Sequence, residues 1–525
     1  MNTTPPTPTL IRLGEDLTLA DVVAVARGNT QVDLSEAART RIAASRAWVE
    51  QTVRSNQLTV YGINTGFGVF ANVRISPEQI RELMRRLILS HAAGVGEPLA
   101  EEVVRAALLI RANTLAQGYS GVRVEIVETL LAMLNRRVHP VIPAKGSVGA
   151  SGDLAPLSHL ALVLSTDAAD REEDSGEAFY QGERLSGKEA MRRAGIPRLI
   201  LEAKEGLALN NGTTISAALT ALALADAQNL VTHSEVAVAM TLEAIRGISH
   251  AFDERIHRAG RHRGQLKVAA RIRDLTHGSR LIDSTPRVQD AYCVRCAPQV
   301  IGAAVDTLEH AARILSEEIN AATDNPLIFV DDQGEAQSRS GGNFHGAAVA
   351  SIADMAAIAV SEVGAISERR TFRLLDAKLN DVLPMMLVES GGLNSGLMMA
   401  QVTAAALVSE NKTLAHPDSV DSIPTSANQE DHVPMAANAA RHLREVVRNT
   451  EHILGIELLA AAQAIDLRLR NMGAQPDILG PGTRAAHARI RSEIQYLDHD
   501  RILHPDIARA TALVHSRELA QVTET

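Results

Sequence analysis

The feature that most constrains the fold is the long stretch Thr213–Ile245, which is rich in alanine and leucine and contains neither glycine nor proline. A helical pattern of this length without internal caps is typical of a helix in a bundle. Apolar residues recur three and four positions apart in further segments, namely Ser35–Val53, Pro77–Ala93, Val300–Ala322, Gly346–Ile366, Leu397–Leu414 and Ala436–Leu469. Only Leu58–Ile63 and Pro326–Asp332 alternate as strands do. The sequence therefore predicts a mainly α fold, a long-helix bundle with a smaller mixed part near the N-terminus.

The long-helix segments follow a mixed part that ends near residue 205, and the first residues are rich in threonine and proline. We therefore predict a flexible tail over 1–15, an N-terminal domain over 16–205 and a helical bundle domain over 206–525. The net charge of −10 argues against a nucleic-acid partner. The first residues lack a basic stretch followed by an apolar run, and no run of 18 apolar residues occurs. We therefore expect no membrane span and a cytoplasmic location. The only cysteines, Cys293 and Cys296, are too few for a zinc site but leave a redox pair open.

Small and polar residues gather in loops between the long helices. These loops are Tyr61–Gly68, Lys145–Asp153, Asn210–Thr214, Ser338–Gly346, Glu389–Gly396 and Ser422–His432. Polar loops at the ends of bundle helices are a common way to build a site. The loop Lys145–Asp153 matches neither the hydrolase elbow nor the phosphate-binding loop, because its glycine spacing is wrong for both. By itself it could be a turn capped by Asp153, or Lys145 could form a Schiff base. The acidic stretch Ser165–Ala178 is expected to be a solvated surface loop.

Read together, these loops resemble one enzyme family across about residues 16 to 506. The matching motifs are "YGINTGFG", "SHAAGVG", "GSVGASGDLAPLSH", "KEGLALNNGT", "VQDAYCVRCAPQV", "NAATDNPL", "GGNFHG", "SERR" and "TSANQEDHV". In this order they resemble the histidine and aromatic amino acid ammonia-lyases. The resemblance implies a carbon–nitrogen lyase of the helical architecture shared with fumarase-like enzymes. It also implies a homotetramer whose active sites combine loops from different subunits.

The resemblance also implies a self-formed prosthetic group. In the family an Ala-Ser-Gly tripeptide cyclises and dehydrates to 4-methylidene-imidazol-5-one (MIO), and it maps onto Ala150, Ser151 and Gly152. The residue types suit this chemistry, because a glycine nitrogen best tolerates close approach to a neighbouring carbonyl. Asp153 is placed to assist proton transfer or to hold the turn. No metal or nucleotide is implied.

Further site residues follow from the same resemblance. Tyr61 would be the base that removes the β-proton, which requires a phenol pKa well below about 10. Arg295 would clamp the substrate carboxylate, for which a guanidinium is suited. The remaining positions would bind the carboxylate, support the prosthetic group, contact the amine or form an aromatic wall, and they are Asn211, Gln289, Tyr292 and Phe344.

Two positions speak to the substrate. His91 could hydrogen-bond an imidazole or a phenol, and Glu430 pairs well with an imidazole N–H but would be buried unpaired against a phenyl ring. We therefore predict L-histidine, giving trans-urocanate and ammonia. The alternatives are a tyrosine or phenylalanine ammonia-lyase, or an MIO-dependent aminomutase. Some segments depart from the histidine-specific pattern, and their roles stay open: Asn210, Leu374–Gly392 with Lys378, Met385 and Met386, and the acidic loop.

Overall fold

The computed structural model describes residues 10–28 and 30–523, and their helix content confirms the predicted mainly α fold. Contacts within the chain divide it into two compact units. Unit 1 consists of the described parts of Met1–Leu222, Ala312–Asp354 and Pro417–Arg441, and unit 2 of Ala223–Ala311, Met355–His416 and His442–Thr525. Each unit thus draws on three separate segments. The domain boundary near residue 205 stays a prediction.

Unit 1 contains short helices around a buried central helix, α4. Its α-helices are α1 (Leu19–Arg27), α2 (Glu36–Ser55), α3 (Ile80–His91), α4 (Glu101–Ala116), α5 (Val124–Asn135), α6 (Leu154–Leu164), α7 (Gly187–Arg193) and α8 (Glu205–Asn210). Its 3₁₀ helices are Gly68–Phe70, Pro77–Gln79 and Ser426–Asn428. Helix α4 is buried on all sides from Val103 to Ala116 and packs against α1 and α5. Helices α3, α6 and α8 pack against one another, which brings the ends of three polar loops together.

The strands of the described chain all belong to unit 1. They form small sheets: β1 (Leu10–Leu13) with β2 (Gln31–Leu34), β3 (Val95–Pro98) with β5 (Pro143–Lys145), β4 (His139–Pro140) with β7 (Glu177–Tyr180) and β8 (Glu183–Ser186), β6 (Ser165–Thr166) with β9 (Leu199–Ile200), and β10 (Leu327–Val330) with β11 (Ala336–Arg339). The hairpin β10–β11 has its register at Leu327 opposite Arg339. The mixed part is therefore not confined to the N-terminal segment, because this hairpin comes from far along the chain.

Four long helices have residues in both units, and the predicted bundle segments correspond to them. They are α9 (Thr214–Ala244), α13 (Ala297–Glu318), α14 (Ala347–Leu375) and α16 (Ala436–Met472). Two of them, α9 and α14, are long and apolar enough to cross a membrane, but 83% and 61% of their most apolar windows are buried inside the structure. A helix that is apolar all round and buried is a core helix.

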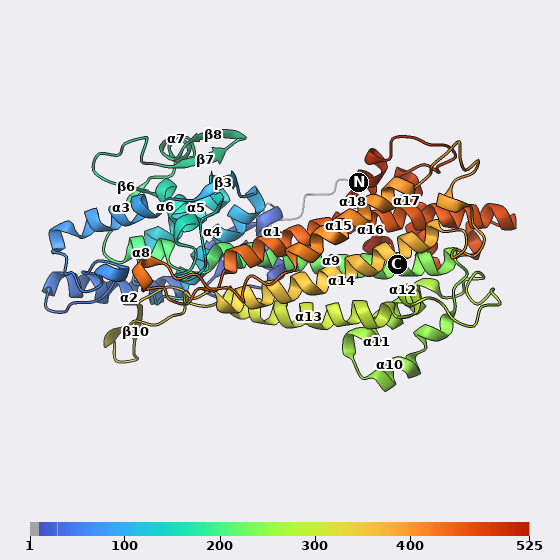
Figure 1. The fold of residues 1–525 in the computed structure, drawn as a ribbon. Coiled ribbons are helices and arrows are strands. Elements are labelled where there is room, and N and C mark those ends of the chain that lie inside the picture. The colour runs from blue at the N-terminus through green and yellow to red at the C-terminus, as the bar shows by residue number, and fades with distance from the viewer. Residues whose placement is uncertain (1–9, 29, 524–525) are drawn as a thin grey trace, which may run out of the picture. The chain divides into compact units, whose positions relative to one another are not determined.

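Unit 2 is built on the long helices together with α15 (Met398–Leu414), and Figure 1 shows α9, α14 and α16 running side by side. Glu457 of α16 joins them: it accepts hydrogen bonds from Thr241 of α9 and from Ser367 and Arg370 of α14. The shorter helices of the unit are α10 (Glu254–Gly260), α11 (Arg263–Thr276), α12 (Tyr292–Arg295), α17 (Pro481–Glu493), α18 (His504–His515), α19 (Glu518–Val522) and the 3₁₀ turns Ser249–Phe252, Met385–Leu387 and Pro476–Ile478.

Three local expectations differ from the structure or extend beyond it. Leu58–Ile63 is wrong as a strand: it forms a turn, because the Asn64 side chain bonds the backbone of Val60 and Leu58. The predicted tail 1–15 lies partly outside the described residues, and Leu10–Leu13 forms β1.

The acidic stretch Ser165–Ala178 is less solvated than expected. Asp170 pairs with Arg198 at 2.6 Å, and the guanidinium of Arg85 donates to the backbone oxygen of Asp174 at 2.6 Å. Ser175 is fully buried. Basic side chains from α3 and from the segment before β9 thus hold the stretch against the rest of unit 1. These partners are distant in sequence, so the charges within the stretch do not predict them.

Candidate active site

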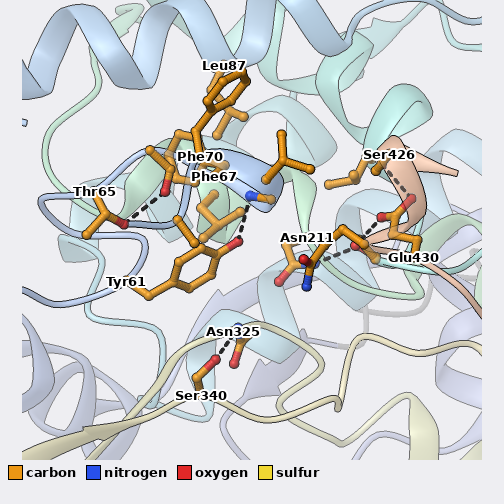
Figure 2. A pocket seen from close by; sticks show the side chains of 18 of the residues that line it. Tyr61, Thr65, Phe67, Phe70, Leu87, Asn211, Asn325, Ser340, Ser426 and Glu430 are labelled. Atoms are coloured by element: carbon orange, nitrogen blue, oxygen red, sulfur yellow. Dashed lines mark hydrogen bonds between the residues drawn. The ribbon is translucent and has the colours of Figure 1, made fainter. Parts of the chain in front are cut away.

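A cavity of about 1410 Å³ in unit 1 collects most of the residues singled out in the sequence. Its lining includes Tyr61, His91, Ala150, Ser151, Asn211, Phe344 and Glu430. Figure 2 shows Tyr61 with Phe67 and Phe70 at one side of the cavity, Glu430 and Ser426 at the other, and Asn211 between them. The packing of α3, α6 and α8 brings together His91 at the end of α3, Ser151 just before α6 and Asn211 at the end of α8.

The loop from Gly146 to Asp153 is folded tightly on itself. Gly152 has a φ of +69° and is bridged to Gly149, Ala150 and Gly212. A Cβ at Gly152 would lie 2.3 Å from the backbone of Gly212, so only glycine fits here. The loop therefore holds Ala150, Ser151 and Gly152 in a tight turn that requires glycine at position 152.

Asp153 anchors this loop to Ser216 of α9 and to the backbone of Gly212. Its carboxylate accepts hydrogen bonds from the backbone and hydroxyl of Ser216 at 2.8 and 2.9 Å and from the hydroxyl of Ser147 at 2.8 Å. Its backbone N–H donates to Gly212 at 2.8 Å. Burial raises the pKa of Asp153 against the effect of these hydrogen bonds. The Asp153 side chain makes no capping hydrogen bond to α6. The alternative prediction, a turn in which Asp153 caps this helix, is therefore wrong.

Two adjacent asparagines at the end of α8 have different tasks. The side-chain N–H of Asn211 donates to the carbonyl oxygen of Ser151 at 2.6 Å. Asn210 donates to the Ser158 hydroxyl on α6 at 3.1 Å and is fully buried. The unusual Asn210 thus ties α8 to the helix that follows the Ala150–Gly152 loop. Arg111, buried in α4, donates to the backbone oxygen of Asn211 at 2.9 Å and fixes this corner.

The Tyr61 side chain contacts other residues of its own loop. Its phenol oxygen accepts from the Gly68 N–H at 3.4 Å, and its ring meets that of Phe67 edge to face with centroids 6.5 Å apart. Burial raises the pKa of Tyr61, the charge of Glu430 raises it further, and the Gly68 N–H opposes both. The expected lowering of the phenol pKa is therefore not present in the single chain, because a desolvated phenol without a nearby cation favours its neutral form.

Glu430 is held as a carboxylate by hydroxyl groups. The Ser151 hydroxyl donates to Oε1 at 2.5 Å, and the hydroxyls of Thr425 and Ser426 donate to Oε2. Burial alone would raise the pKa of Glu430, but these three hydrogen bonds and nearby His91 keep it below its ordinary value. Thr425 and Ser426 were not among the predicted site residues, although both stand in the same motif as Glu430.

His91 ends helix α3 and faces the same cavity. Its Nδ1 lies 2.9 Å from the Ser90 hydroxyl. Burial lowers the pKa of His91 despite the field of Glu430, so the ring is neutral at neutral pH. A neutral imidazole and a carboxylate thus share one cavity and offer a ligand both a donor or acceptor and a negative charge.

Three expected site residues belong to unit 2, and none of them lines the cavity of unit 1 in the described chain. They are Gln289, Tyr292 and Arg295. Tyr292 is 71% exposed, and the Arg295 guanidinium lies 4.5 Å over its ring. Arg370, paired with Glu457, donates to the backbone oxygen of Cys293 at 3.4 Å and supports this helix. The roles expected for Gln289, Tyr292 and Arg295 therefore stay predictions.

Other lining residues stand in the quoted motifs and loops but received no predicted role. Asn325 donates to the Ser340 hydroxyl at 3.0 Å, and His345 and His432 stack with ring centroids 5.9 Å apart. The motif "GGNFHG" contained His345, but only its Phe344 was selected. Among the described residues, no group of three or more His, Cys, Asp or Glu side chains could hold a metal ion.

Comparisons with known proteins extend over nearly the whole chain. Residues 17–492 match the family model for aromatic amino acid lyases. The chain is 52% identical over 511 residues to a histidine ammonia-lyase of Caldanaerobacter subterraneus subsp. tengcongensis, covering 97% of each. It superposes on the crystal structure of histidine ammonia-lyase from Trypanosoma cruzi with a TM-score of 0.89 and 42% identity, covering 98% of this chain and 95% of that one. A tyrosine aminomutase from Streptomyces globisporus gives a TM-score of 0.90 and 34% identity, covering 99% and 98%.

Proposed function

This chain belongs to the aromatic amino acid lyase family and is a carbon–nitrogen lyase, and we propose that it eliminates ammonia from L-histidine to give trans-urocanate. The observation that carries the choice of substrate is that His91 and an ionised Glu430 line the same cavity. The histidine ammonia-lyases to which the chain is about half identical support the same choice.

We further propose that Ala150, Ser151 and Gly152 form the MIO group. The fit rests on the Gly152 turn, where a Cβ would collide with Gly212, and on the Asn211 amide that binds the Ser151 carbonyl. When formed, the group supplies an electrophile for the substrate amine. Asn211 then keeps its carbonyl oriented, and Asp153 with Ser216 keeps the turn in place.

Tyr61 is the proposed base for the β-proton. Its phenol has a raised pKa in the single chain, so it needs positive charge from its surroundings to ionise near neutral pH. The substrate ammonium and Arg295 of a second copy are such charges. Tyr61 would then hold the abstracted proton on its phenol oxygen while ammonia leaves.

We also propose a cytoplasmic homotetramer with shared active sites. Gln289, Tyr292 and Arg295 lie outside the unit 1 cavity, and apolar side chains near them and elsewhere on unit 2 are open, including Val288 at 92% exposure and Leu393 at 87%. We take the burial of these side chains against another copy as part of the proposal. A second copy would cover them and supply the carboxylate clamp.

A tyrosine-specific reaction is the second candidate. His91 could also bind a phenol, and a tyrosine aminomutase is among the similar structures. Phenylalanine should be poor, because a site built around hydrogen-bonding groups rejects an analogue without them by about four to five powers of ten.

A side-by-side ultraviolet assay with histidine, tyrosine and phenylalanine tests the proposal. Urocanate should form fastest, and Glu430→Gln should lower histidine turnover because the amide no longer offers a charge to the ring N–H. Ser426→Ala is the matched control: it removes one donor to Oε2 but leaves the carboxylate, so its effect should be smaller. Faster formation of coumarate, or of β-tyrosine by product analysis, would assign the other reaction.

A further inference from the structure

The two oxygens of the Glu430 carboxylate have different kinds of partner. Oε2 accepts from Thr425 and Ser426, which belong to its own loop. Oε1 accepts from Ser151, which is 279 positions away in sequence. The hydrogen bonds from Thr425 and Ser426 fix the carboxylate within its own loop. The hydrogen bond from Ser151 joins the carboxylate to the residue whose hydroxyl must be eliminated.

The segment that carries Glu430 is fastened to the Ala150–Gly152 loop. The backbone N–H of Met435 donates to the oxygen of Val148 at 2.8 Å, and Ala150 packs with Val433 and Met435 in one buried cluster. Between Thr425 and Glu430 the backbone pairs with itself across left-handed residues such as Ala427, with a φ of +52°. Glu430 is therefore presented to Ser151 by a constrained turn and not by a free loop end.

The dehydration of Ser151 needs a defined side-chain direction. Its Cα–H and Cβ–Oγ bonds break, a Cα=Cβ double bond forms, and the hydroxyl leaves as water with the proton from Cα. The second water comes from ring closure, in which the Gly152 nitrogen bonds to the carbonyl carbon of Ala150. The Ala150 oxygen leaves in this water together with the amide protons of Ser151 and Gly152. A free serine side chain occupies three staggered rotamers, and elimination requires one of them.

We propose that Glu430 positions the Ser151 hydroxyl for the dehydration that creates the prosthetic group, a role separate from binding the substrate ring. This inference rests on the proposed function, because it concerns how the MIO group forms. Once the hydroxyl has left as water, Oε1 of Glu430 loses the Ser151 donor and faces the cavity. The same carboxylate oxygen thus serves Ser151 in the newly folded chain and an imidazole N–H in the mature enzyme.

The test follows maturation by intact mass, with no use of turnover. The full chain is synthesised in a cell-free system, and the loss of two waters is recorded against time. Glu430→Met, which offers no hydrogen-bond acceptor, should lose the waters about ten- to a hundredfold more slowly, the factor that corresponds to a hydrogen bond with a charged group. Glu430→Gln retains an acceptor oxygen and should recover most of the rate.

The controls separate this role from a general disturbance of the cavity. Asn325→Ala removes a hydrogen bond to Ser340 in the same cavity and should mature as the unmodified chain does. Thermal unfolding of each variant establishes that it is folded. If Glu430→Met loses both waters at the unmodified rate, or if Glu430→Gln is as slow as Glu430→Met, the positioning role is wrong. If the unmodified chain itself keeps its full mass, the proposed prosthetic group fails instead.

Discussion

The side-chain amide of Asn211 donates a 2.6 Å hydrogen bond to the carbonyl oxygen of Ser151, while its neighbour Asn210 bonds Ser158 in the core. Two adjacent, chemically identical side chains therefore serve the site and the scaffold respectively. The buried guanidinium of Arg111 fixes the backbone at the end of α8 by donating hydrogen bonds to the carbonyl oxygens of Ala208 and Asn211.

This pair gives a matched test. Asn211→Ala should lower kcat by about a hundredfold, the loss typical of removing one well-placed donor at a reacting group. Asn210→Ala should keep kcat within a few-fold but lower the free energy of unfolding by about 1 kcal/mol, because one buried hydrogen bond is lost. Steady-state kinetics and denaturant unfolding on both variants measure the two effects. Equal kinetic losses would show that Asn211 acts only through the scaffold.

Ser151→Ala should leave a folded chain with almost no activity. Without a β-hydroxyl, no methylene can form, so turnover should fall by at least about a thousandfold. Intact mass should show no loss of two waters, while circular dichroism stays that of the unmodified chain. Appreciable turnover in this variant would exclude the proposed chemistry.

Turnover should rise from neutral to alkaline pH. The pKa of Tyr61 is raised in the single chain, so the phenolate fraction increases as the pH approaches that value from below. Tyr61→Phe should abolish turnover while L-histidine still binds in calorimetry, since the ring and its contact with Phe67 remain. A Tyr61→Phe enzyme with the original alkaline rise would place the base elsewhere.

Shared active sites predict complementation between two inactive variants. Tyr61→Phe damages unit 1 and Arg295→Ala damages unit 2, so each alone should be nearly inactive. When the two are co-expressed, a site built from unit 1 of one copy and unit 2 of another has both halves intact in about one case in four. Purification through two different tags followed by the urocanate assay measures the recovery. No recovery in confirmed mixed oligomers would mean that each chain builds its own site.

Acid should destabilise the fold in part through His139, a buried residue of β4. Burial is the main cause that lowers its pKa to about 4, and its Nε2 lies 3.3 Å from the Arg105 guanidinium. The unfolded chain binds a proton there at about 6.5 and the folded chain does not. The free energy of unfolding therefore falls as the pH drops from about 6.5 to about 4.

The loss from His139 amounts to about 3 kcal/mol in full. His139→Gln keeps the hydrogen-bonding capacity without the titration, so its stability should depend less on pH across this interval. Scanning calorimetry of both proteins at several pH values isolates this residue, because all other titrating groups are common to them. Parallel curves for the two proteins would contradict the assignment.

Much of this molecule is local in origin and could be predicted from the sequence. The long apolar segments correspond to α9, α13, α14 and α16, with ends shifted by four residues or fewer except at α14, which extends from the predicted Ile366 to Leu375, because helical periodicity records which face is buried. The motifs of the polar loops, taken in their order, resemble those of one family, and the comparisons confirm that family. Leu58–Ile63 misled because its alternation is outweighed by Asn64 bonding the preceding backbone.

Only the tertiary structure decided which predicted residues share a cavity and what their charges are. Tyr61, Ser151 and Glu430 line one cavity although they stand far apart along the chain, and no sequence pattern encodes that proximity. The raised pKa of Tyr61 and the lowered pKa of Glu430 follow from desolvation and from hydroxyl groups that fold against them. Protonation depends on the sum of all neighbours in space, whereas periodicity and turn chemistry depend on neighbours along the chain. That difference is why the sequence could suggest the candidate site residues, whereas the fold determined how they are held and charged.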